Sequence, residues 1–199
     1  MKNLEKKLYY LVNGITFYRL IAAPFLLVLI FTKQLDLFKW LLAFSFFTDA
    51  IDGYLARKYK VVSVMGSRLD SIADDMTIFV AIVGLFVWHL GFIRQAYIWI
   101  LLLLLLFLIQ LTLALIRYKK PTSFHTYLAK IAAVFQALFL ILAFFLSSPS
   151  RPLFYVTIAL TALDIIEETI MVMMLPKWQA DVKSLYHVFR PRQGLKRSK

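Results

Sequence analysis

Acidic side chains interrupt the second and third long apolar stretches of this sequence. Four of them are aspartates with helical spacing: Asp49 and Asp52 are three residues apart, and Asp70 and Asp74 are four residues apart. Each pair therefore projects from one face of a helix, and the short segment between the stretches allows the two faces to meet. A charge at bilayer depth costs about 2.5–3.5 kcal/mol even on the mildest insertion scales. The four aspartates therefore require a strong compensating interaction.

A divalent cation is the most direct compensation. Carboxylates this close cannot all ionise in a low dielectric unless cations neutralise them, and oxygen-only ligands favour Mg²⁺, Mn²⁺ or Ca²⁺. Bridging carboxylates can also hold two ions about 3.5–4 Å apart and clamp a phosphate between them. Ion pairing alone would need a comparable number of interior bases, whereas the apolar stretches offer only Arg19, Lys130 and, near an edge, Arg57. We therefore predict a two-metal site for Mg²⁺, Mn²⁺ or Ca²⁺, with Mg²⁺ or Mn²⁺ preferred.

Small residues and an arginine are interleaved with the aspartates. Gly53, Ala56 and Gly66 remove side-chain bulk, which would let a ligand approach the backbone, although helix packing is the simpler explanation for Gly53 alone. The planar fork of Arg57 suits a phosphate, and taken singly it also fits a cytoplasmic membrane anchor. Together with the metal site, these residues suggest a substrate that contains a diphosphate.

The whole sequence has the composition of a polytopic membrane protein. It has 199 residues, of which 61% are hydrophobic, and a mean hydropathy of +0.75. Six apolar stretches of membrane-spanning length predict six helices, at residues 11–31, 38–59, 69–92, 96–116, 126–146 and 153–175. The connections between them are short, with Pro121, Pro149 and Pro152 at helix boundaries. We expect a single membrane domain over residues 1–199, with an amphipathic juxtamembrane helix at 1–10 and a basic tail at 177–199.

The basic residues predict the orientation. Lys and Arg outnumber Asp and Glu by 23 to 11, and most lie in the N-terminal segment, the second and fourth connections and the tail. By the positive-inside rule both termini are cytoplasmic, which places the aspartates near the cytoplasmic surface. Because the excess charge lies in short loops, nucleic-acid binding is disfavoured. The chain has no cysteine, so disulfides and thiolate metal sites are excluded.

The acidic run resembles the signature of the CDP-alcohol phosphatidyltransferase family. All eight signature positions match, in the order Asp49-x2-Asp52-Gly53-x2-Ala56-Arg57-x8-Gly66-x3-Asp70-x3-Asp74. The resemblance implies transfer of a phosphatidyl group from CDP-diacylglycerol to an acceptor alcohol, with release of CMP. It also implies a homodimer in a membrane, which we expect to be the bacterial cytoplasmic membrane.

The resemblance also implies roles for individual residues. Asp49, Asp52 and Asp70 should ligate the metals, and Asp74 should be both a ligand and the general base. Arg57 should contact the diphosphate. The remaining residues expected to line the CDP-lipid site are Gly53, Ala56, Ser63 and Gly66, together with Asn13 and Thr16 from the first helix.

A second resemblance concerns the acceptor. The segment Asn13-x2-Thr16-x2-Arg19 with Pro24 resembles the start common in the phosphatidylglycerophosphate synthase-like and related cardiolipin synthase branches, and glycerol 3-phosphate is the acceptor that we favour. Capping and packing of the first helix is an equally good explanation of Asn13 and Thr16. Asp75 stands where many relatives have lysine, and the Arg-Glu pair frequent in glycerophosphate-using members is replaced by Arg117-Tyr118. Inositol phosphate, serine and phosphatidylglycerol therefore remain alternative acceptors.

An anionic acceptor needs cationic groups near the metals, and Arg117, His125 and Lys130 meet this requirement by position. Lys130 lies about one turn inside its helix, where a simple anchor would extend back to the surface. We therefore favour an acceptor phosphate as its partner over an acid of the sixth helix. His125, near a helix start, also fits a capping or surface role.

Three acids of the sixth stretch, Asp164, Glu167 and Glu168, share one helical face. We interpret them as structural partners of interior bases, and we expect Arg19 to pair with one of them; an additional ion site is the alternative. For the protein as a whole, a cation transporter is the rival from another functional class, since intramembrane acids also mark ion pathways. Neither inverted repeats nor broken helices are visible in the sequence. An inactive scaffold is disfavoured by the intact set of signature acids.

Overall fold

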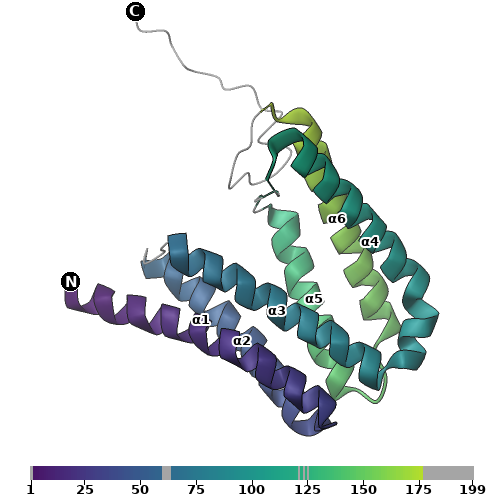
Figure 1. Cartoon of the computed structure of the whole chain (residues 1–199), viewed down its shortest axis with the longest axis horizontal. Helices are drawn as coiled ribbons and strands as arrows, with labels where there is room; N and C mark the ends of the chain where they lie inside the picture. The colour runs from purple at the N-terminus through teal and green to yellow at the C-terminus, as the bar shows by residue number, and fades with distance from the viewer. Residues whose placement is uncertain (1, 60–63, 121, 123, 125, 177–199) are drawn as a thin grey trace, which may run out of the picture. The chain divides into compact units, whose positions relative to one another are not determined.

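The structure is a computed structural model that describes residues 2–59, 64–120, 122, 124 and 126–176 (Figure 1). Within these ranges the side chains of residues 2–13, 52–57, 64–68 and 71 are outside the description. The described residues form six helices and no strand, which confirms the all-α prediction for this part of the chain. The helices are α1 (Lys2–Phe31), α2 (Leu35–Tyr59), α3 (Val64–Trp88), α4 (Leu90–Tyr118), α5 (Tyr127–Phe145) and α6 (Arg151–Met174).

The N-terminal segment differs from its prediction. We expected a separate amphipathic helix at 1–10, whereas α1 runs without a break from Lys2 to Phe31. A change from polar to apolar composition marks where a helix would enter a bilayer, but it does not interrupt the backbone hydrogen bonds that continue the helix. The predicted segment therefore forms the first turns of α1.

The junction between α3 and α4 also lies elsewhere than predicted. We expected it at residues 93–95, but only His89 separates the two helices. Its backbone N–H still donates to the carbonyl of Leu85, and the N–H of Ile93 donates to the carbonyl of His89. Because both sides of this junction are apolar, the hydropathy profile carries little information about where the chain changes direction.

The end of α1 sets the direction of the next helix. Lys33 has a positive φ of 57°, its N–H donates to the carbonyl of Ile30, and the N–H of Gln34 donates to the carbonyl of Leu29. This pair of bonds is the Schellman arrangement that satisfies carbonyls at a helix C-terminus. The tight turn makes α2 an antiparallel neighbour of α1.

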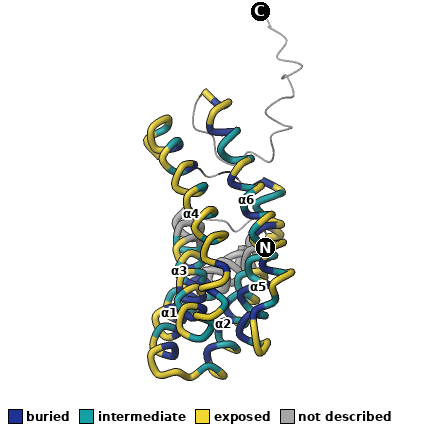
Figure 2. Tube along the Cα trace, turned by 90° about the vertical axis from the view of Figure 1, so that its right-hand side faces the viewer, coloured by how far each residue is buried: buried dark blue, intermediate teal, exposed yellow. Residues whose placement is uncertain are grey.

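In the part of the chain that the structure describes, three helices are long and apolar enough to cross a membrane by length and composition: Gly14–Phe31 within α1, Leu90–Tyr118 and Tyr127–Phe145. Figure 2 shows exposed positions along the helices. Many exposed residues are large and apolar, among them Leu101, Leu104, Leu105 and Leu108 on α4. An apolar outer surface of this extent is expected where a helix faces lipid rather than water. The protein is therefore an integral membrane protein.

The chain divides into two compact units. The first contains residues 1–93 and 140–149, and within it α1 packs against both α2 and α3 (Figure 1). An aromatic cluster forms part of its core, where the ring of Phe38 on α2 lies 4.9 Å from the rings of Trp88 and Phe144. Gly84 on α3 makes room for this cluster, because a Cβ there would lie 3.0 Å from Phe38 Cζ and from Phe144 Cζ.

The second unit contains residues 94–139 and 150–199. In it α6 contacts both other helices: Tyr155 packs edge-on against Trp99 of α4, and Phe154 lies 5.5 Å from Phe139 of α5 between ring centroids. Near the C-terminus of α6, Met171 and Val172 are buried with Ala114 of α4. These contacts hold the acids of α6 among polar residues of its neighbours, described below.

Candidate metal centre

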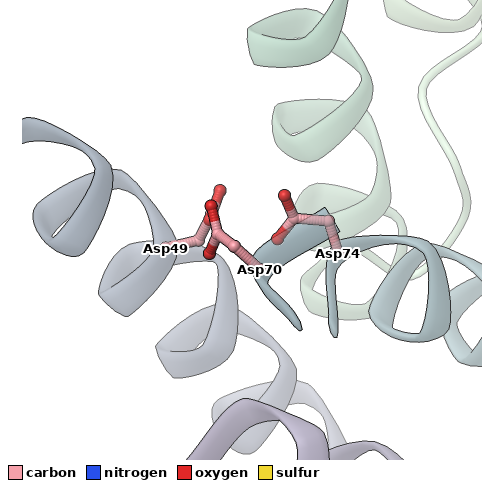
Figure 3. A group of neighbouring side chains, drawn as sticks. All are labelled: Asp49, Asp70 and Asp74. Atoms are coloured by element: carbon pink, nitrogen blue, oxygen red, sulfur yellow. The ribbon is translucent and has the colours of Figure 1, made fainter. Parts of the chain in front are cut away.

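Carboxylates from two helices converge in the first unit. Asp49 lies on α2, and Asp70 and Asp74 lie one turn apart on the same face of α3. One oxygen of each carboxylate lies within 4.8 Å of the corresponding oxygens of the other two. Figure 3 shows the three side chains directed toward a common point. The helical spacing in the sequence therefore does bring these three acids together.

A buried arginine of α1 lies among these carboxylates. Arg19 Nη1 donates to Asp49 Oδ1 at 2.7 Å and also to Asp74 Oδ1, and Arg19 Nη2 donates to Asp70 Oδ1. Only 1% of the Arg19 side chain is exposed. A single guanidinium thus joins three carboxylates from two other helices, as its planar fork allows.

This contact corrects the prediction that Arg19 pairs with Asp164, Glu167 or Glu168. The reason is that Arg19 and Asp49 lie at nearly the same distance from the turn that joins α1 and α2. Arg19 lies 12 residues before the end of α1 at Phe31, and Asp49 lies 14 residues after the start of α2 at Leu35. At 1.5 Å per residue these distances are about 18 Å and 21 Å, so the two side chains are level in neighbouring antiparallel helices. The same count along the sequence places Arg19 and Asp49 at one level, and the packing of α1 against α2 brings them into contact.

The guanidinium does not balance the charge of the cluster. Taken by themselves, these three carboxylates and the one guanidinium carry a formal charge of −2. Their side chains also remain 35–37% exposed, so they are not sealed inside the helix packing. A further cation would therefore be favoured at this position.

The donor set fits Mg²⁺ or Mn²⁺. All candidate ligand atoms are carboxylate oxygens, which hard divalent cations prefer. Two ligand oxygens on opposite sides of a Mg²⁺ ion are about 4.2 Å apart, so a set of oxygens within 4.8 Å needs only small side-chain adjustments. Asp49, Asp70 and Asp74 are the residues that would hold such an ion.

The first helix contributes one further candidate. Thr16 is 4% exposed and lies one turn before Arg19, on the same side of α1. The other predicted ligands of the metals and of the CDP-lipid have side chains outside the described residues. They are Asn13, Asp52, Gly53, Ala56, Arg57, Ser63 and Gly66.

Two of the three predicted acceptor ligands are described, and both lie in the second unit. Arg117 Nε, at the end of α4, donates to the carbonyl of Leu175 at 3.2 Å, just past the end of α6. The ammonium of Lys130 is solvent-exposed and lies 5.6 Å from the centre of the Tyr127 ring. His125 is outside the described residues.

Two acids of α6, Asp164 and Glu168, have hydrogen-bond partners other than the interior bases that we predicted. Glu168 accepts hydrogen bonds from Gln110 Nε2 and Thr122 Oγ1, both at 2.9 Å, and Asp164 accepts one from Thr126 Oγ1 at 3.3 Å. These donors are an amide and two hydroxyls, not the interior bases that we expected. The neutral donors lie on α4 and in the α4–α5 connection, where the packing of α6 brings them to Glu168 and Asp164.

Comparisons with known proteins agree with the signature. The family model described as CDP-alcohol phosphatidyltransferase matches residues 9–167. A cardiolipin synthase (CMP-forming)/mitochondrial hydrolase fusion protein of Schizosaccharomyces pombe is 38% identical over 74 residues, which cover 36% of this chain and 12% of that protein. The CDP-diacylglycerol–inositol 3-phosphatidyltransferase of Saccharomyces cerevisiae is 39% identical over 70 residues, which cover 35% of this chain and 31% of that protein.

The matched stretch thus spans less than a third of the length of either relative. No solved structure matches the chain. The family model, in contrast, extends from α1 through most of α6. It therefore includes Arg19 and all four signature aspartates, and it includes Asp164 and Glu167 of α6. With a match of this extent, and with Asp49, Asp70 and Asp74 of the signature brought together by α2 and α3, the chain belongs to the CDP-alcohol phosphatidyltransferase family.

Proposed function

We propose that the protein transfers a phosphatidyl group from CDP-diacylglycerol to an acceptor alcohol and releases CMP. The observation that carries this proposal is the convergence of Asp49, Asp70 and Asp74 within 4.8 Å, in a chain that matches the family over residues 9–167. A group of carboxylate oxygens is suited to a divalent cation, and a divalent cation is suited to a diphosphate. Family membership supplies the CDP-linked donor.

In this proposal the four signature aspartates hold Mg²⁺ or Mn²⁺, with Asp52 completing the set. When bound, the metal pair would neutralise negative charge on the diphosphate and on the departing CMP. Asp74 also acts as the general base: it accepts the proton of the acceptor hydroxyl, whose oxygen forms a bond to the lipid-side phosphorus. The bond between that phosphorus and the oxygen shared with CMP breaks, so CMP leaves with that oxygen.

The remaining site residues are assigned by their positions. Arg57 contacts the diphosphate, and Gly53, Ala56, Ser63 and Gly66 line the pocket for the nucleotide. Asn13 and Thr16 approach the same pocket from α1; the burial of Thr16 on the Arg19 side of that helix supports this assignment.

Glycerol 3-phosphate is the favoured acceptor, and this assignment rests on Asn13-x2-Thr16-x2-Arg19 of the phosphatidylglycerophosphate synthase-like branch. Lys130 and His125 are proposed to bind the acceptor phosphate. Arg117 is the weaker candidate of the three, because its Nε bond to Leu175 already gives it a role at the end of α6. Inositol phosphate, serine and phosphatidylglycerol are the alternatives.

We also propose the membrane arrangement. All six helices span the bilayer, including α2, α3 and α6, which carry acidic residues. Both termini face the cytoplasm of a bacterial cell. The distribution of Lys and Arg supports this orientation, which would leave the aspartate cluster accessible from the cytosol. A homodimer is expected from the family.

The test is a CMP-release assay on the full chain in detergent–lipid micelles with CDP-diacylglycerol. Each acceptor is supplied in turn, with Mg²⁺, with Mn²⁺ or with EDTA. We expect CMP release only with a divalent cation and one acceptor, with glycerol 3-phosphate the most active. If no acceptor supports CMP release while the protein in vesicles carries Mn²⁺ across the bilayer, a transporter replaces this proposal.

A further inference from the structure

Arg19 contacts the same carboxylates that would hold the metals, and this overlap has a functional consequence. We propose that Arg19 is the built-in counter-cation of the aspartate cluster: it holds α1, α2 and α3 together through Asp49, Asp70 and Asp74, and it competes with the divalent cation for their oxygens. The inference rests on the proposed metal site. It makes Arg19 a positioning residue that sets how tightly the metal binds.

The first support is the permanence of the Arg19 charge. A guanidinium does not lose its proton in a protein, so burial cannot neutralise it as burial could neutralise a lysine. Arg19 is 1% exposed, and a charge buried to that extent needs partners. The three aspartates supply these partners from two separate helices. The contact therefore links all three helices that form the cluster.

The second support is the geometry of the shared oxygens. Arg19 uses one oxygen, Oδ1, of each of the three carboxylates. A divalent cation held by the same three carboxylates would lie close to the guanidinium, and the two positive charges would repel each other. Metal binding should therefore weaken the contacts of Arg19.

The two effects predict opposite changes when Arg19 is removed. Without its guanidinium the three carboxylates repel one another, so the protein in EDTA should be less stable. The same carboxylates should bind a divalent cation more tightly, because the competing charge is gone. A purely structural arginine would show the first change and not the second.

The test compares Arg19→Gln and Arg19→Lys with the unaltered chain. Lys39→Gln is the matched control: it removes one positive charge of the same unit, from a side chain that pairs with the exposed Asp36. Mn²⁺ binding to each purified protein in micelles is measured by the electron paramagnetic resonance signal of free Mn²⁺. The temperature of unfolding is measured in EDTA and in saturating Mn²⁺.

We expect Arg19→Gln to lower the unfolding temperature in EDTA, to enlarge its rise with Mn²⁺, and to tighten Mn²⁺ binding on the order of tenfold, a common size for coupling between two binding events. Arg19→Lys keeps the charge but loses the fork, so it should bind Mn²⁺ with an intermediate affinity. Lys39→Gln should match the unaltered chain. If Arg19→Gln does not fold, the test is whether Arg19→Lys binds Mn²⁺ more tightly than Lys39→Gln does.

Unchanged or weaker Mn²⁺ binding in a folded Arg19 variant overturns the inference, and so does a failure of the unaltered chain to bind Mn²⁺. The proposed function fails by a different result, the absence of CMP release with every acceptor. Tighter Mn²⁺ binding in Arg19→Gln without any CMP release from the unaltered chain would therefore retain this inference and reject the enzyme activity.

Discussion

The two units of this protein each hold a group of acids, and the groups are stabilised in different ways. In the first unit a guanidinium contacts Asp49, Asp70 and Asp74. In the second unit amide and hydroxyl donors contact Glu168 and Asp164. Neutral donors satisfy the lone pairs of a carboxylate and add no opposing charge, whereas Arg19 adds one charge against three.

The difference indicates where chemistry is expected. A residual negative charge on partly exposed oxygens attracts a mobile cation, and with it a diphosphate. Hydrogen bonds from the side chains of Gln110, Thr122 and Thr126 instead connect α6 to the segments beside it. We therefore interpret the first group as the reactive one and the second as structural, although each group contains two acids that share a face of one helix.

The largest expected effect concerns the proposed base. Asp74→Asn should lower the rate of CMP release by about 10²–10⁴-fold, because the amide cannot accept the proton of the acceptor hydroxyl. Glu168→Gln is the matched change in the other group and should leave the rate within a few-fold of the unaltered chain. Both rates are measured at saturating Mn²⁺, with unfolding temperatures to verify folding. Equal losses in the two variants would remove the distinction between the groups.

A smaller effect is expected from the packing that supports the first group. Gly84→Ala would place a Cβ 3.0 Å from Phe38 Cζ and Phe144 Cζ, and overpacking of this kind costs about 1–3 kcal/mol. The unfolding temperature should fall. Gly91→Ala is the control, because its Cβ would meet nothing within 4 Å and alanine favours a helix over glycine. If both variants are equally stable, the rings move aside and the aromatic cluster does not constrain α3.

The smallest effect should come from the second group. Thr122→Val keeps the shape of the side chain but removes the hydroxyl that donates to Glu168 and accepts from Gln110. Because Gln110 still donates to Glu168, the loss should be about 1 kcal/mol of stability. Mn²⁺ affinity should stay unchanged. A clear change in Mn²⁺ affinity would mean that the acids of α6 take part in metal binding.

Much of the helical architecture is predictable from the sequence, because length and apolar composition are local properties of each segment. All six predicted helices are found among the described residues, and Asp49, Asp70 and Asp74 converge as their spacing indicates. The boundaries are less predictable: α1 begins at Lys2 and α3 ends at Trp88, since helix continuation and chain reversal depend on backbone hydrogen bonds that hydropathy does not report. The side chains of Asp52 and Arg57 lie outside the described residues, so their roles stay predictions.

The sequence by itself determined the helices, the signature aspartates and the family, because each depends on residue types at fixed spacing along one or two neighbouring segments. Only the tertiary structure decided which base meets which acid. Arg19 had candidate partners on α2, α3 and α6, and the packing of α1 against α2 and α3 selected Asp49, Asp70 and Asp74. Charge pairing acts over a few ångströms, so it follows the packing of helices and not the order of residues in the chain.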